Sequence, residues 1–148
     1  MNRPPQKFRD FAERLVSPAM AKAKSSASKS PMVVTVFGQL RTSLVPIVGS
    51  LGFSTALSRA LAAANAEFAW LRTVHVKPDG SLEGLDGLEV KVDSKEIAEG
   101  GIVLLAEFFS LMVTLIGERL VLQLVRQAIP KVHEDDLYFG EDNEREKK

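Results

Sequence analysis

The chain of 148 residues contains no cysteine, a single tryptophan and tyrosine, and only 2 histidines. Without cysteine it cannot form a disulfide, a thiolate nucleophile, a cysteine-ligated zinc site or an iron–sulfur cluster. The histidines, His75 and His133, lie far apart in the sequence and do not form a metal-ligand pair such as HExxH. We therefore expect no cofactor and no bound metal.

Motifs of catalysis and nucleotide binding are lacking as well. The sequence has no GxSxG nucleophile elbow, no GxxxxGK phosphate-binding loop and no EF-hand pattern. A serine nucleophile such as Ser54 would need His75 or His133 as its base, whereas serine is typical of helix caps and turns. The sequence favours a protein that is not an enzyme, and a hydrolase with an unrecognised site is the third hypothesis.

The chain also lacks net charge, because 19 Lys and Arg residues balance 19 Asp and Glu residues. Such a balance gives no general attraction to nucleic acid or to anionic membranes, so we favour neither as a partner. Basic residues nevertheless gather in the first thirty positions. The second hypothesis is therefore an accessory protein that uses this basic N-terminal arm to bind nucleic acid or a membrane surface.

The length of the strongly apolar stretches predicts no membrane span. The longest one, Ile102 to Ile116, is interrupted by Glu107 and is shorter than the roughly 20 residues that cross a bilayer. The N-terminus lacks the apolar segment and small-residue cleavage site of a secretory signal. We expect a soluble, cytoplasmic protein in which the 102–116 stretch is part of the core.

Composition divides the chain into four parts. We predict an amphipathic arm at 1–20, a flexible linker at 21–30, a core domain at 31–130 and a charged tail at 131–148. The arm has apolar residues at helical spacing, whereas the linker, AKAKSSASKS, has none that could be buried. We therefore predict that residues 1–30 are not needed for folding.

Periodicity predicts three helices in the core, near 32–45, 54–71 and 94–129. Pro46 should end or kink the first, and the last should either break near the double glycine 100–101 or bend near Gly117. Alternating apolar residues predict strands near 73–77 and 88–92, joined through the turn formers Pro78-Asp79-Gly80. The expected fold is a mainly α domain of three to four helices, with a short β-hairpin between the second and last core helices.

The last helix carries a narrow polar strip. A projection at about 100° per residue aligns Glu107, Ser110, Thr114 and Glu118. A carboxylate alone in an apolar run would point to a raised pKa and acid–base chemistry. On a polar strip it is more simply the solvated edge of a buried helix. We therefore interpret Glu107 as structural, with a catalytic acid as the alternative.

Beside this strip runs a groove of small side chains, formed by Ala106, Ser110, Val113 and Gly117. Another helix could approach closely there. Two occupants fit: the helix near 54–71 of the same chain, which has its own small face, or the same helix of a second chain. Because apolar residues cover most of the last helix, we expect a homodimer through this groove. The leading hypothesis is a non-enzymatic interaction or regulatory domain that acts through helix packing and self-association. Such a domain could also bind another protein partner.

Overall fold

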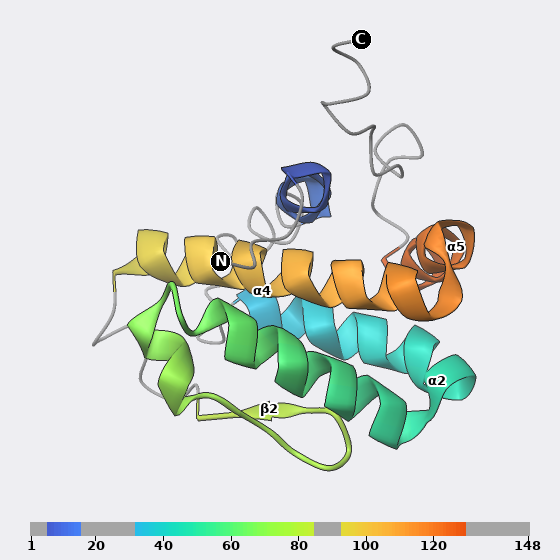
Figure 1. Ribbon diagram of the computed structural model, residues 1–148, viewed down its shortest axis with the longest axis horizontal. Coiled ribbons are helices and arrows are strands. Elements are labelled where there is room, and N and C mark those ends of the chain that lie inside the picture. Colours follow the sequence, from blue (N-terminus) through green and yellow to red (C-terminus); the bar gives the residue numbers. More distant parts are fainter. Residues whose placement is uncertain (1–5, 16–31, 85–92, 130–148) are drawn as a thin grey trace, which may run out of the picture.

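The computed structural model describes residues 6–15, 32–84 and 93–129 (Figure 1). Its helices are an N-terminal helix at 6–15, α2 (Met32–Ala64), α4 (Ser94–Ile116) and α5 (Glu118–Ala128). A 3-10 helix, η1 (Ala69–Thr73), leads into an antiparallel hairpin of β1 (His75–Val76) and β2 (Leu82–Glu83). The predicted mainly α class with a short hairpin is confirmed. The linker at 21–30, the strand near 88–92 and the tail at 131–148 lie outside the described residues.

α2 consists of two helices joined at Gly49. This glycine has φ 83° and ψ 159°, a conformation that other residues adopt only with strain. Figure 1 shows the first half of α2 in cyan and the second half in green, running back beside it. Pro46, which was expected to end or kink the first helix, lies inside it, and the helix ends one turn later at Gly49. Proline near the end of a helix removes only one hydrogen bond, whereas the backbone of Gly49 leaves the helix altogether.

A second glycine corner separates α4 from α5. Gly117 has φ 93° and ψ 151°, and its N–H donates to the Val113 carbonyl at 2.9 Å. The last helix therefore breaks at this glycine and not at the double glycine 100–101. A Cβ on Gly100 would lie 2.7 Å from Cζ2 of Trp70, so Gly100 allows the indole ring to approach α4 closely. The ring is fixed there by a hydrogen bond from Trp70 Nε1 to the Glu96 carbonyl.

The hairpin is tighter than the sequence predicted. His75 pairs with Glu83 and Val76 with Leu82, so β1 has a partner strand at 82–83, whereas the strand predicted near 88–92 lies outside the described residues. The chain turns back at once because the Asp79 carboxylate accepts hydrogen bonds from the Ser81 hydroxyl and N–H, at 2.7 and 3.0 Å. These bonds hold the pKa of Asp79 below its ordinary value.

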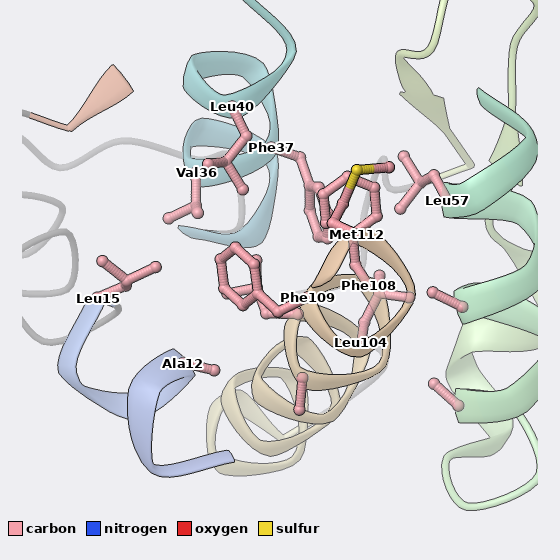
Figure 2. Close-up of a cluster of buried hydrophobic side chains, with 14 of the residues drawn as sticks. Ala12, Leu15, Val36, Phe37, Leu40, Leu57, Leu104, Phe108, Phe109 and Met112 are labelled. Atoms are coloured by element: carbon pink, nitrogen blue, oxygen red, sulfur yellow. The ribbon is translucent and has the colours of Figure 1, made fainter. Parts of the chain in front are cut away.

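Contacts between phenylalanine rings connect the helices. Phe108 of α4 is fully buried and makes edge-to-face contacts with Phe37 and Phe53, one from each half of α2, at centroid distances of 5.3 and 5.2 Å. The neighbouring Phe109 makes the same kind of contact with Phe11 of the N-terminal helix at 5.1 Å. Figure 2 shows Phe108 and Phe109 between these elements. α4 is therefore the central helix of the core.

The N-terminal helix belongs to this core. Its apolar residues Phe8, Phe11, Ala12 and Leu15 are at most 5% exposed. The core thus extends beyond the predicted boundary at residue 31. This packing argues against the prediction that residues 1–30 are dispensable for folding. The sequence showed the amphipathic face of the arm but not that α4 offers a complementary groove.

Both corner glycines should resist substitution. We expect Gly49→Ala and Gly117→Ala each to lower the free energy of unfolding by about 1–3 kcal/mol, because alanine is strained at these dihedral angles. Gly38→Ala is the matched control: Gly38 is helical and exposed, with open space for a Cβ, so the change should stabilise by about 0.5–1 kcal/mol. Urea denaturation measures all three. Equal stability of the Gly38 and Gly49 variants would contradict the corner geometry.

Candidate interaction surface

Exposed apolar side chains gather at the two glycine corners. In the part of the chain that the structure describes, the large apolar residues that are exposed are Ile47 at 51%, Leu51 at 77% and Leu115 at 62%. Each lies two residues from a corner glycine. Both corners are at the same end of the molecule's longest axis (Figure 1), where α5 packs on both α2 and α4. We call Ile47, Gly49, Leu51, Leu115 and Gly117 the corner surface.

The parts of α2 on either side of Gly49 and the part of α4 that leads into Gly117 carry no charged residue. No Asp, Glu, Lys or Arg occurs between Arg41 and Arg59, or between Glu107 and Glu118. At 1.5 Å per residue, these segments extend about 12–15 Å from each corner. These segments give the corner end of the molecule an apolar character that was not predicted from the sequence. The sequence contained a signal for this surface, because each segment without charged residues contains a corner glycine or ends at one.

The edge of the corner surface carries one charge of each sign. Glu118 and Arg119 follow Gly117 directly, and both are exposed. In a two-fold assembly each residue of one copy can face the other residue of its partner, so such a pair is self-complementary. The same pair has no net charge to attract an anionic surface.

The predicted groove of small residues does not lie on one accessible face. Ala106 is completely buried within the chain, Ser110 and Val113 are half-buried, and Gly117 is exposed at the corner. The small residues Ala56, Ala60 and Ala64 of α2 are also buried, and α2 packs mainly on α4. The inner part of the groove is therefore used inside the chain, and its outer part leads to the corner surface.

Glu107 is half-buried on α4 and Thr114 is exposed farther along this helix, whereas Glu118 begins α5. The predicted polar strip therefore ends at the Gly117 corner. Burial raises the pKa of the Glu107 carboxyl above its ordinary value, and the nearby Glu67 carboxylate raises it further. The raised pKa of Glu107 therefore follows from its position at the edge of the core and from its neighbour Glu67.

The raised pKa of Glu107 predicts a specific pH dependence. Because the folded chain favours the protonated carboxyl, this contribution to stability is full below the ordinary pKa and is lost as the pH rises through the raised one. We expect Glu107→Gln to lose less stability than the wild type between about pH 4 and pH 7 in urea denaturation. Glu118→Gln, at an exposed position at the start of α5, is the control. Identical pH profiles for the wild type and Glu107→Gln would contradict this expectation.

A small cleft lies between α2 and the hairpin turn. It has a volume of about 200 Å³ and is lined by Phe37, Gly38, Arg41, Gly80, Ser81 and Leu82. Arg41 Nη1 donates to the Asp79 carbonyl at 3.0 Å, which fixes the turn against α2. The cleft is smaller than the roughly 300–1,000 Å³ of typical ligand sites.

The other groups considered for chemistry are dispersed. His75 is exposed on β1, whereas His133 lies outside the described residues. Ser54 is buried, and its hydroxyl donates to the Leu51 carbonyl of its own helix at 3.2 Å. Within residues 6–15, 32–84 and 93–129, no three His, Asp or Glu side chains are grouped as metal ligands.

Two segments are long and apolar enough to cross a membrane by length and composition, Val36–Ala64 and Lys95–Ile116. The first contains the corner at Gly49, so its two halves lie side by side (Figure 1). The second is α4, the central helix of the core, whose Phe108 and Phe109 are fully buried.

Comparisons with models of protein families, with curated proteins and with solved structures return no match to this chain.

Proposed function

We propose that this protein is a non-enzymatic interaction domain that self-associates end to end as a two-fold dimer through the corner surface. The observation that carries the proposal is the gathering of Ile47, Leu51 and Leu115 at one end of the molecule, on segments that carry no charge. A second copy covers these side chains with an identical apolar surface. Val113 and Gly117 of the predicted groove border the contact, whereas Ala106 supports it from within.

A second copy suits this surface better than a lipid bilayer. The backbone groups at helix ends lack partners within their helices. Two helices end and two begin at the corners, and lipid would leave such groups unsatisfied, whereas a protein contact can hydrogen-bond them. The pair Glu118 and Arg119 complements itself and adds no net positive charge toward lipid. The proposal therefore places the dimer in the cytoplasm.

Sedimentation equilibrium tests the proposal. We expect the wild-type chain to reach twice its monomer mass at high micromolar concentration. Leu51→Ser/Leu115→Ser should remain monomeric and folded, because both side chains are exposed in the single chain. The matched control Ala62→Ser/Ala66→Ser changes two exposed positions farther from the corners and should dimerise like the wild type.

Two outcomes would contradict the proposal. One is a folded wild type that stays at the monomer mass. The other is a double leucine variant that dimerises as strongly as the control. Flotation with neutral and anionic vesicles distinguishes the membrane alternative: a monomeric wild type that floats in a Leu51-dependent manner would replace the second copy with lipid.

A further inference from the structure

The N-terminal helix is bound to the rest of the molecule as a separate amphipathic ligand would be. Its buried residues Phe8, Phe11, Ala12 and Leu15 occupy positions i, i+3, i+4 and i+7. This spacing is the usual pattern of a helix that lies in an apolar groove. Gln6, Asp10 and Glu13 face solvent on the opposite side.

The groove is formed by α4 and the first half of α2. Figure 2 shows Ala12 and Leu15 pointing toward Phe109 and Val36, and the rings of Phe11 and Phe109 meet at 5.1 Å. Val36 and Phe109 are fully buried beneath the helix. Val36 is about 20 Å of helix away from Gly49, so this groove is distinct from the corner surface.

We infer that this groove is a helix-binding site that also accepts the N-terminal helix of a second copy of the chain. The anchors all lie within residues 6–15, and the same sequence on another copy makes the same contacts. Residues 16–31 connect the helix to α2, and sixteen residues can extend over about 50 Å. The helix of the same chain competes with an effective concentration on the order of millimolar.

A labelled peptide measures this exchange directly. The probe is a fluorescein-labelled peptide with the sequence of residues 1–20, and the matched control peptide carries Phe11→Ser. The receptors are the full-length wild type and full-length Phe11→Ser, whose own helix has lost its central anchor. We expect the probe to bind the Phe11→Ser chain at least tenfold more tightly than the wild type, by fluorescence anisotropy. The control peptide should bind at least tenfold more weakly than the probe.

If the Phe11→Ser chain is poorly folded, its melting temperature provides a second readout. A peptide that binds only the folded state raises the melting temperature by mass action, so the probe should stabilise this chain and the control peptide should not. The inference is overturned if the two peptides behave alike in both readouts. It is also overturned if the probe neither binds nor stabilises Phe11→Ser at millimolar concentration. Neither result depends on the dimer at the corner surface.

Discussion

Phe108→Ala should lower the free energy of unfolding by about 3–5 kcal/mol, the usual cost of removing a buried phenylalanine ring. The ring is fully buried and makes edge-to-face contacts with Phe37 and Phe53. Such ring pairs add about 0.5–1.5 kcal/mol beyond the area that they bury. A domain of this size is stable by only about 5–15 kcal/mol, so the variant should be close to unfolding at moderate temperature.

Urea denaturation followed by circular dichroism measures this loss. Leu115→Ala is the control on the same helix, because Leu115 is 62% exposed in the single chain. At concentrations where the chain is monomeric, its stability should change by no more than about 0.5 kcal/mol. A loss below about 1 kcal/mol for Phe108→Ala would mean that the rings do not form the centre of the core.

Phe11→Ala should lower the free energy of unfolding by about 3 kcal/mol. This is the lower end of the range for a buried phenylalanine, because a terminal helix can leave its groove without unfolding the remaining core. Phe11 is completely buried, and its ring meets Phe109 at 5.1 Å. The prediction reverses the expectation, drawn from composition alone, that the first thirty residues do not affect folding.

The control for Phe11 lies on the same helix. Gln6 is exposed, and its side chain bonds Asp10 one turn away, so Gln6→Ala should change stability by no more than about 0.5 kcal/mol. If Phe11→Ala and Gln6→Ala are equally stable, the arm is dispensable after all. The domain boundary near residue 31 would then stand.

Much of the architecture could be predicted because helical periodicity is a strong local signal. The apolar stripes of α4 and of the second half of α2 predicted the positions of these helices in the sequence. The alternation around Val74 and Val76 located the first strand. The strand at 82–83 was not predicted because Leu82 and Glu83 are too few to show a period, whereas Asp79 and Ser81 close the turn through local hydrogen bonds.

The breaks within helices were harder to predict. Gly49, Gly100 and Gly117 are alike in sequence, but Gly100 continues its helix beneath Trp70 while the other two form corners. Which role a glycine takes depends on tertiary packing. The corner surface was missed for the same reason, because Leu51 and Leu115 look like core residues until the corners place them at an end of the molecule.

Distances between spin labels on different copies show whether two copies meet at the corner surface. The chain has no cysteine, so one introduced cysteine carries one spin label. Ser50→Cys places the label at a corner, and Ala62→Cys places it at an exposed position about 20 Å farther along the same helix. A dimer through the corner surface should give a short distance between copies for position 50 and a clearly longer one for position 62. No measurable distance at position 50, or a shorter one at position 62, would contradict it.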